Sequence, residues 1–170
     1  MPAITKALQI APLVEADHAD WRRLWGHYQQ FYEVALTEAV HASTWARLLD
    51  ADEPVHGALA RDATGAAVGL VHYIRQRTCW DTADSCYLQD LYVDEAQRGS
   101  GVGRALIAHV VRAAAGFGAA HVHWLTHQTN SRAMRLYDDV AVRTGFVQYG
   151  LATQDPRLGA TASPKADAVR

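Results

Sequence analysis

The sequence predicts an α/β protein of one domain, built on a mixed and mostly antiparallel sheet. Three observations carry this prediction. Segments with the alternating pattern of strands and segments with the 3.6-residue pattern of helices follow one another in the order β-α-α-β-β-β-α-β-α-β. Residues 85–127 have the strand–helix–strand order of a crossover between parallel strands. The 170 residues suffice for one hydrophobic core without disulfides or metals.

The first third of the chain predicts one strand and two helices. Residues 3–14 alternate around apolar side chains, which predicts a strand that ends near Pro12. From Asp17, a residue type favoured at N-caps, apolar side chains recur at helical spacing. They are Trp21, Leu24, Trp25, Tyr28, Phe31 and Tyr32. A second helix is expected from about Thr37 to the turn that begins at Asp50.

The middle of the chain predicts a hairpin and a third strand. Residues 55–62 and 66–78 are strand-like and are joined by a short turn that contains glycine, as in an antiparallel hairpin. Residues 85–94 form the next strand. Its alternation places Tyr87, Gln89, Leu91 and Val93 on one face and Leu88, Asp90 and Tyr92 on the other, unless a bulge shifts the parity.

The rest of the chain predicts two more helices and two more strands. A helix begins after the glycine-rich turn at residues 99–103 and stops at Gly116 and Gly118. Residues 120–126 predict a strand, residues 130–144 a helix capped by Asn130, and residues 145–151 a closing strand. We therefore expect one domain over residues 3–152 and a mobile tail over residues 153–170.

The composition narrows the function classes. Apolar residues make up 49% of the chain, charged residues 20%, and the net charge is −2, so no positive field would gather nucleic acid. No segment has the roughly 20 apolar residues of a membrane span, and the N-terminus has no cleavage-site pattern, which predicts a cytoplasmic protein. Cys79 and Cys86 match no zinc spacing and are expected to be reduced thiols without a chemical role.

The glycine-rich turn RGSGVGRA, residues 98–105, can be compared with known glycine-rich motifs by its spacing. A nucleotide-hydrolase phosphate loop requires lysine and then Ser or Thr after the last glycine, whereas Arg104 and Ala105 follow here. The dinucleotide fingerprint requires a small residue where Arg104 stands. A turn of this kind between a strand and a helix nevertheless presents free backbone N–H groups to a phosphate. A tight turn without a ligand is the alternative.

The segment resembles the acetyl-coenzyme A loop of the GNAT superfamily of N-acetyltransferases, whose signature is Gln/Arg-x-x-Gly-x-Gly/Ala. The resemblance extends over most of residues 3–150 and is nearest to the spermidine/spermine branch and related histone or polyamine acetyltransferase-like proteins. It implies the GNAT fold, a mostly antiparallel sheet splayed at the cofactor site with helices on both faces, and no metal. The cofactor residues it implies are Leu91, Tyr92, Val93, Gln97, Arg98, Gly99, Ser100, Gly101, Val102, Gly103, Arg104, Asn130 and Tyr137.

Amide formation requires a free amine and a proton for the departing thiolate. An alkyl ammonium with a pKa of about 10.4 is neutral to roughly 1 part in 2,500 at pH 7, so its deprotonation needs assistance. Tyr137 matches the family's acid position, although periodicity alone would make it a core residue. The polyamine branch has glutamate where this chain has Gln89, and an amide cannot accept the proton. Gln89 could orient a water while Asp90, Glu33 or His72 supplies basicity. Asp90 is the first candidate because it is adjacent to Gln89, but strand alternation turns it to the other face, where it would be a structural carboxylate.

Three further groups have both a functional and a structural interpretation. Glu33 and Glu38, between the first two helices, could attract a cationic amine or could be solvated surface acids. His121, His123 and His127 have metal-like spacing but lack a local partner ligand, which favours a structural role. The aromatic stripe that starts at Trp21 is more typical of a core than of a cleft wall.

The sequence therefore predicts acetyl transfer from acetyl-coenzyme A to a small polyamine-like amine, by direct attack in a ternary complex. A protein lysine acetyltransferase and an acyl-coenzyme A-binding module with weakened catalysis remain as alternatives. The resemblance also implies a homodimer, for which a strand edge near residues 145–151 would be available.

Overall fold

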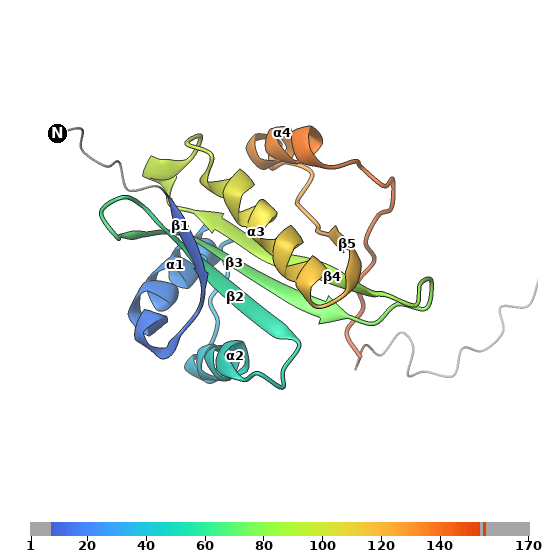
Figure 1. Cartoon of the computed structure of the whole chain (residues 1–170), viewed down its shortest axis with the longest axis horizontal. Coiled ribbons are helices and arrows are strands. Elements are labelled where there is room, and N and C mark those ends of the chain that lie inside the picture. The colour runs from blue at the N-terminus through green and yellow to red at the C-terminus, as the bar shows by residue number, and fades with distance from the viewer. Residues whose placement is uncertain (1–7, 154, 156–170) are drawn as a thin grey trace, which may run out of the picture. The chain divides into compact units, whose positions relative to one another are not determined.

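The computed structural model describes residues 8–153 and residue 155. Contacts divide the chain after Val140 into two compact units, and the helices and strands lie in the first. The elements are β1 (Gln9–Pro12), α1 (His18–Phe31), α2 (Glu38–Leu49), β2 (Val55–Arg61), β3 (Ala67–Gln76), β4 (Asp84–Val93), α3 (Val102–Gly116), β5 (Ala119–His123) and α4 (Ser131–Val140), with 3-10 turns η1 (Glu15–Asp17) and η2 (Glu95–Gln97) (Figure 1).

The five strands form one mixed sheet in the order β1-β2-β3-β4-β5. The first three pairings are antiparallel, and β4 pairs with β5 in parallel through the crossover helix α3. This confirms the predicted mixed and mostly antiparallel α/β fold. The β4–β5 ladder covers only Asp84–Tyr87 of β4, so the two strands separate beyond it, as the splayed sheet requires.

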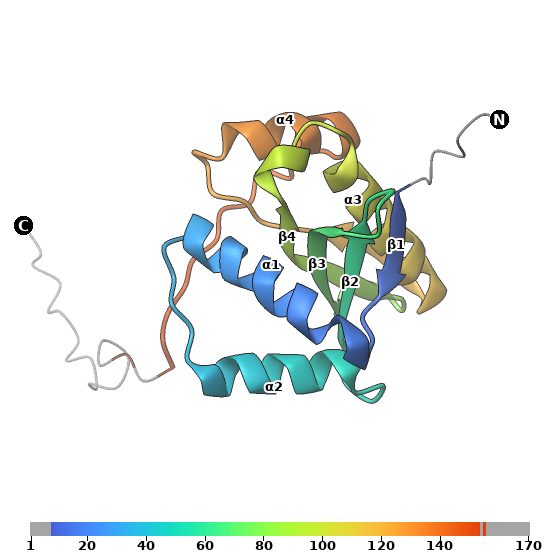
Figure 2. The same cartoon turned by 90° about the vertical axis from the view of Figure 1, so that its left-hand side faces the viewer.

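Helices cover both faces of the sheet, as predicted. On one face α1 and α2 pack against the strands, and on the other face lies α3, which also contacts α4 (Figure 2). The core under α3 includes Leu106 and Val110, both fully buried, and the core under α1 includes Trp21 and Leu24. A Cβ on Gly69 would lie 3.0 Å from the side chains of both Leu106 and Val102, so this glycine allows α3 to approach β3.

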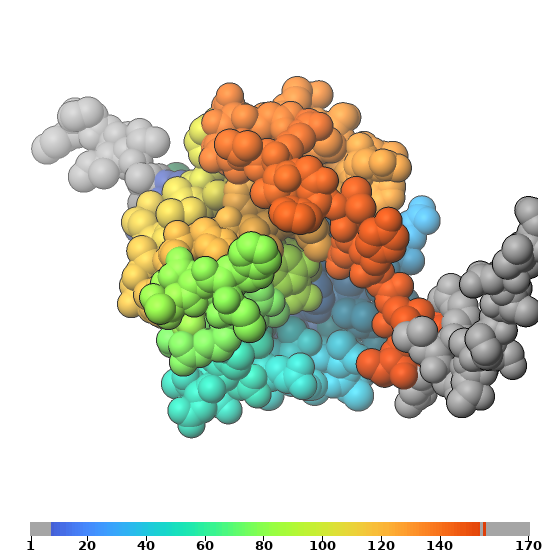
Figure 3. Space-filling view, turned by 90° about the vertical axis from the view of Figure 1, so that its right-hand side faces the viewer, coloured from blue at the N-terminus to red at the C-terminus, as the bar shows by residue number. Residues whose placement is uncertain are grey.

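The β3–β4 loop, residues 77–83, projects from the surface between the α2 side and the α3–β5 side of the molecule (bright green in Figure 3). At its tip Trp80 is 98% exposed, next to the exposed Cys79. Its base is fixed by the buried carboxylate of Asp84, which pairs with Arg75 and with Arg77. These ion pairs hold the pKa of Asp84 below its usual value, Arg75 having the larger effect.

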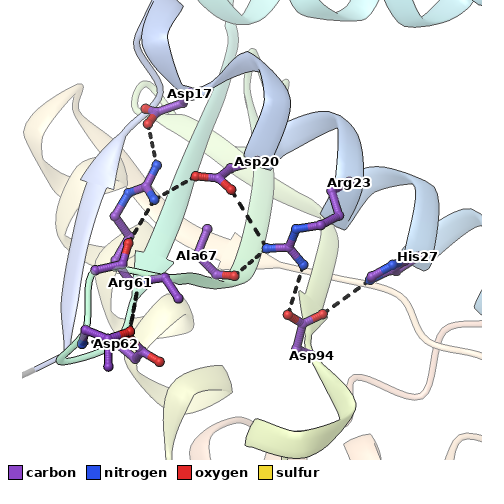
Figure 4. Close-up of polar contacts among 11 residues, drawn as sticks. Asp17, Asp20, Arg23, His27, Arg61, Asp62, Ala67 and Asp94 are labelled. Atoms are coloured by element: carbon purple, nitrogen blue, oxygen red, sulfur yellow. Dashed lines mark hydrogen bonds and ion pairs between the residues drawn. The ribbon is translucent and has the colours of Figure 1, made fainter.

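Ion pairs attach α1 to the β2–β3 hairpin and to the end of β4 (Figure 4). The Arg61 guanidinium donates to Asp17 and Asp20, each at 2.7 Å. Arg23 donates to the carbonyl oxygen of Ala67 at 2.6 Å and to Asp94 at 3.2 Å. Because Asp94 directly follows β4, these bonds hold α1 in a fixed position relative to β4, the strand that leads into the glycine-rich turn.

One of the predicted helix caps is wrong. Asp17 precedes α1 but does not cap it, because its carboxylate accepts from the Val14 N–H and from Arg61. Thr37, by contrast, caps α2 by accepting from the Val40 N–H. Asn130 caps α4 by accepting from the Ala133 N–H at 3.4 Å.

A β-bulge in β4 decides which side chains face which helix. His72 pairs with Asp90 while the next residue of β3, Tyr73, pairs with Leu88, so Gln89 is the extra residue. Leu88 therefore packs in the core under α3, and Asp90 turns to the opposite face. The uninterrupted alternation, which placed these two side chains on one face, is wrong at this point.

The predicted closing strand, residues 145–151, is also wrong. Residues 141–153 form no strand, because their backbone has no ladder partner in the described part of the chain. The apolar side chains of Phe146, Val147 and Tyr149 are 91%, 74% and 91% exposed. The strand edge expected there for a dimer is therefore not formed. The predicted tail, residues 153–170, lies outside the described residues except for positions 153 and 155.

Candidate active site

The separation of β4 from β5 opens a cavity of about 570 Å³, which we call the splay cavity. Of the thirteen residues predicted to hold a cofactor, eleven line it: Leu91, Tyr92, Val93, Gln97, Arg98, Gly99, Gly101, Gly103, Arg104, Asn130 and Tyr137. The other two point elsewhere. Ser100 donates its hydroxyl to the Gln97 carbonyl oxygen at 2.6 Å, and Val102 is buried in the core.

The glycine-rich turn has the backbone shape that an anion site requires. Gly99 and Gly101 both have φ of +92°, in the left-handed region that favours glycine. The first backbone hydrogen bond of α3 runs from the Ala105 N–H to the Gly101 carbonyl oxygen, so the N–H groups of residues 102–104 are not used by the helix. An added Cβ on Gly99 or Gly101 meets no atom within 4 Å, which leaves space beside these N–H groups for a ligand.

Charge in the splay cavity is of one sign. Four arginines line it, Arg98 and Arg104 from the turn and Arg132 and Arg135 from α4, and no carboxylate is in the lining. Arg104 also pairs with Asp139 of α4, which lies outside the lining. Arg98 also holds the turn to the strand, because its Nε donates to the Val93 carbonyl oxygen at 3.0 Å. The Thr126 hydroxyl, on another lining residue, is buried and has no hydrogen-bond partner among the described residues. The arginines and the unused N–H groups of the turn fit a ligand with a phosphate-bearing end, such as coenzyme A.

Tyr137 lies on α4 at the wall of the splay cavity. Its ring packs edge-on against Trp124 with centroids 5.5 Å apart. Burial, with a smaller effect of Tyr32, raises the pKa of Tyr137 to about 12. The phenol therefore keeps its proton throughout the neutral range and can donate it.

A second cavity of about 550 Å³, the α2 cavity, lies between α1, α2 and the sheet. Tyr28, Tyr32 and Gln89 line both cavities, so the two adjoin at these side chains. The α2 cavity has one carboxylate, Asp90, and one guanidinium, Arg47. A group held in one cavity can thus meet a group held in the other at the bulge of β4.

The remaining predicted site residues separate into two sets. Gln89 is exposed at the bulge where the cavities adjoin, and Asp90, beside it, is nine-tenths buried. Glu33 and Glu38 line neither cavity. Glu33 is exposed with φ of +55°, and Glu38 pairs with Arg22 at 3.1 Å on the surface. Their role in acceptor binding stays a prediction.

Sequence reasoning missed the cavity-lining arginines of α2 and α4. Arg47, Arg132 and Arg135 are exposed positions of amphipathic helices, where arginine has no distinctive pattern. The contact of Trp21 with His72 had no local signal, because the two residues are 51 positions apart.

The geometry of the two cavities agrees with the comparisons with known proteins. The sequence model of the Acetyltransferase (GNAT) family matches residues 13–141. The chain belongs to the GNAT acetyltransferase family. It is 40% identical over 134 residues to the D-amino-acid N-acetyltransferase HPA3 of Saccharomyces cerevisiae, covering 78% of this chain and 83% of that protein. These findings make the chain an N-acetyltransferase, whereas the polyamine branch stays a prediction.

Solved structures show the same fold. The aminoglycoside N-acetyltransferase AAC(6')-Iy in complex with CoA matches with a TM-score of 0.78 at 19% identity, over 90% of this chain and 99% of that one. The ribosomal-protein-alanine N-acetyltransferase of Brucella melitensis biovar Abortus 2308 matches with a TM-score of 0.71 at 21% identity, over 86% and 99%. At these identities the likeness concerns the fold alone.

In the described residues, no three His, Cys, Asp or Glu side chains form a group that could hold a metal ion. His123 instead stacks on Tyr87 with ring centroids 5.4 Å apart. None of the helices over residues 8–153 has the length and apolarity to cross a membrane.

Proposed function

We propose that this GNAT protein transfers acetyl from acetyl-coenzyme A to the primary amine of a small molecule, by direct attack in a ternary complex. The observation that carries the proposal is the junction of the two cavities. Tyr28, Tyr32 and Gln89 line both, with the protonated Tyr137 on one side and the carboxylate of Asp90 on the other. An acid for the leaving group and a base for the attacking amine are thereby available across one junction.

Acetyl-coenzyme A would supply an activated thioester carbonyl. The turn and the four arginines of the splay cavity bind its phosphates through N–H groups and charge. Asp90 takes one proton from the acceptor ammonium. The amine nitrogen then bonds to the thioester carbonyl carbon, the carbon–sulfur bond breaks, and Tyr137 gives a proton to the departing sulfur. The second proton, which nitrogen loses as it becomes an amide, restores the phenol of Tyr137. Covalent catalysis by a thiol is disfavoured, because neither cysteine lines a cavity and burial raises the pKa of Cys86 to about 11.

The charges of the α2 cavity favour an amino acid as acceptor. An α-amino acid has one ammonium and one carboxylate, which match Asp90 and Arg47. The indole N–H of Trp25, a lining residue of this cavity, is buried and has no hydrogen-bond partner among the described residues. A polyamine has several cations and would meet Arg47 unfavourably. The name of the yeast relative, a D-amino-acid N-acetyltransferase, supports the same class.

The test measures release of free coenzyme A thiol from acetyl-coenzyme A with a panel of acceptors. The panel contains D- and L-amino acids, their carboxamides, polyamines, aminoglycosides and lysine peptides. We expect amino acids to be acetylated with a KM at least tenfold below that of their carboxamides, because an amide lacks the charge that pairs with Arg47.

Variants separate this reasoning from a general loss of activity. Arg47→Gln should raise KM for the amino acid at least tenfold and leave KM for its carboxamide within twofold. Arg112→Gln, an exposed arginine of α3 across the sheet that lines neither cavity, is the matched control. Preference for polyamines or lysine peptides would show that the acceptor is not a free amino acid. Tight binding of coenzyme A without acceleration by any amine would favour the weakened binding module.

Homodimer formation and a cytoplasmic location remain predictions from the resemblance and the composition. Sedimentation of the full chain measures the first of them, and a molecular mass of one chain would contradict it.

A further inference from the structure

Three buried side chains from three different elements form a hydrogen-bonded row beside the α2 cavity. The indole Nε1 of Trp21, on α1, donates to Nε2 of His72, on β3, at 3.0 Å. The other ring nitrogen of His72, Nδ1, lies 3.0 Å from Oδ2 of Asp90, on β4. The three residues are 0%, 3% and 9% exposed. Only Asp90 and His72 reach the cavity wall, and Trp21 lies behind them.

The row fixes the position of the imidazole proton. An indole N–H can only donate, so Nε2 of His72 must be the acceptor. The proton of the neutral ring therefore sits on Nδ1, where it points at Asp90. A second proton on Nε2 would face the indole proton and would break the bond to Trp21. Trp21 thus makes His72 a hydrogen-bond donor to the carboxylate.

Tyr28, on α1, lines the α2 cavity together with Asp90. Burial, with a smaller effect of the charge of Asp90, raises the pKa of Tyr28, so the phenol stays protonated. The other ionisable groups around the carboxylate are Tyr87 on β4, whose pKa is also raised by burial and by Asp90, and Arg47 of α2 in the same cavity. His72 is the hydrogen-bond donor to the carboxylate, which lines the α2 cavity next to Gln89 at the junction.

We propose that Trp21 and His72 are positioning residues that hold Asp90 as the proton acceptor for the substrate ammonium. This inference rests on the proposed acetyl transfer and deepens it. The N–H bond of the ammonium breaks and a bond forms from the proton to a carboxylate oxygen of Asp90. The electron pair stays on nitrogen, which becomes the nucleophile, and the proton then leaves for solvent through the α2 cavity.

A purely structural role explains the row less well. A carboxylate and an imidazole buried under an aromatic cluster cost desolvation free energy, which apolar side chains of similar volume would avoid. The bulge at Gln89 also interrupts the β3–β4 ladder at the point that turns Asp90 toward this cavity. Gln89 itself cannot take the proton, so the bulge places a carboxylate where the adjacent amide would be inert.

The test compares pH profiles of kcat in the full chain. Asp90→Asn should lower kcat about 100-fold or more at pH 7. Its kcat/KM for the acceptor should rise about tenfold per pH unit from pH 7 to 9, because only amine that is already neutral in solution then reacts. His72→Leu should give the same type of profile. His72→Asn, which retains a donor near Nδ1, should recover at least tenfold of the rate lost in His72→Leu.

Trp21→Phe tests the first member of the row while keeping an aromatic ring. Without the indole N–H, the imidazole is no longer confined to the tautomer that donates to Asp90. We therefore expect a lower kcat, and a pH profile whose acid side begins to fall at a higher pH than in the unchanged protein. Trp45→Phe is the matched control, since Trp45 packs on Trp21 with ring centroids 4.9 Å apart and lines neither cavity. The acid side of the kcat profile should lie at the same pH in Trp45→Phe as in the unchanged protein. Coenzyme A binding and circular dichroism report whether each variant is folded.

Two results would overturn the inference. One is an unchanged pH profile in Asp90→Asn. The other is a kcat and acid limb in Trp21→Phe equal to those of Trp45→Phe, together with equal rates in His72→Leu and His72→Asn. Failure of the unmutated protein to acetylate any amine would instead refute the proposed function, so the two failures are distinguishable.

Discussion

Replacing Gly101 by alanine tests the glycine-rich turn as the phosphate site. Gly101 and Gly65 have nearly the same backbone, with φ of +92° and +91°, and a Cβ on either meets no atom within 4 Å. A left-handed alanine costs about 1–2 kcal/mol, so both variants should lose this much stability. Gly65 lies in the β2–β3 turn, whereas Gly101 lines the splay cavity. Gly65→Ala is therefore a control for backbone strain alone.

The two variants should differ in their affinity for coenzyme A. A methyl group on residue 101 would enter the space beside the free N–H groups and displace a phosphate oxygen from at least one of them. A hydrogen bond to a charged group contributes about 1.5–3 kcal/mol, which corresponds to a Kd about 10- to 150-fold higher. Titration calorimetry with coenzyme A measures this difference, and urea unfolding measures the shared loss of stability. Equal affinity in both variants would refute the assignment of the turn.

Other expectations concern catalysis, α1 and pH. Tyr137→Phe should lower kcat about 100-fold while KM for acetyl-coenzyme A changes less than threefold, because the phenol acts as an acid; unchanged turnover in steady-state kinetics would remove it from that role. Arg61→Met should lower the free energy of unfolding by about 1–2 kcal/mol through the partly exposed pairs with Asp17 and Asp20, against less than about 0.5 kcal/mol for the surface pair removed by Arg22→Met, both measured by urea unfolding. Burial, with a smaller effect of Arg75, lowers the pKa of His56, so below about pH 6.5 the unfolded chain binds more protons and stability falls as pH drops. His56→Phe should reduce this slope between pH 7 and 5 in urea titrations, and an unchanged slope would show that other groups are responsible.

Much of the fold follows from local patterns. The helix after the glycine-rich turn begins at Val102 and ends at Gly116, as its apolar spacing and its glycines predict. The helix after Thr37 and the β2–β3 hairpin also form where capping and turn residues place them. These signals act between residues three or four positions apart, or across one tight turn, so the sequence contains them directly.

The splay cavity was predictable for a different reason. The eleven lining residues that were predicted lie within residues 91–104 and 130–137, two segments that the resemblance to GNAT proteins covers. The α2 cavity gathers residues from both N-terminal helices and from three strands. No single segment of the sequence contains a pattern for this cavity, so the sequence alone did not indicate Arg47 as a site residue.

The chain's own residue order thus determines where helices and strands occur, where the backbone offers N–H groups to phosphate, and that Gln89 stands where a base is expected. Only the tertiary structure decides which side chain is placed for the role that we propose for that base. The bulge arises from the hydrogen bonds between β3 and β4, and it turns Asp90 toward α1. His72 then reaches Asp90 from 18 positions away along the chain, and Trp21 reaches His72 from 51 positions away. These contacts depend on packing of the sheet against α1 and not on local spacing.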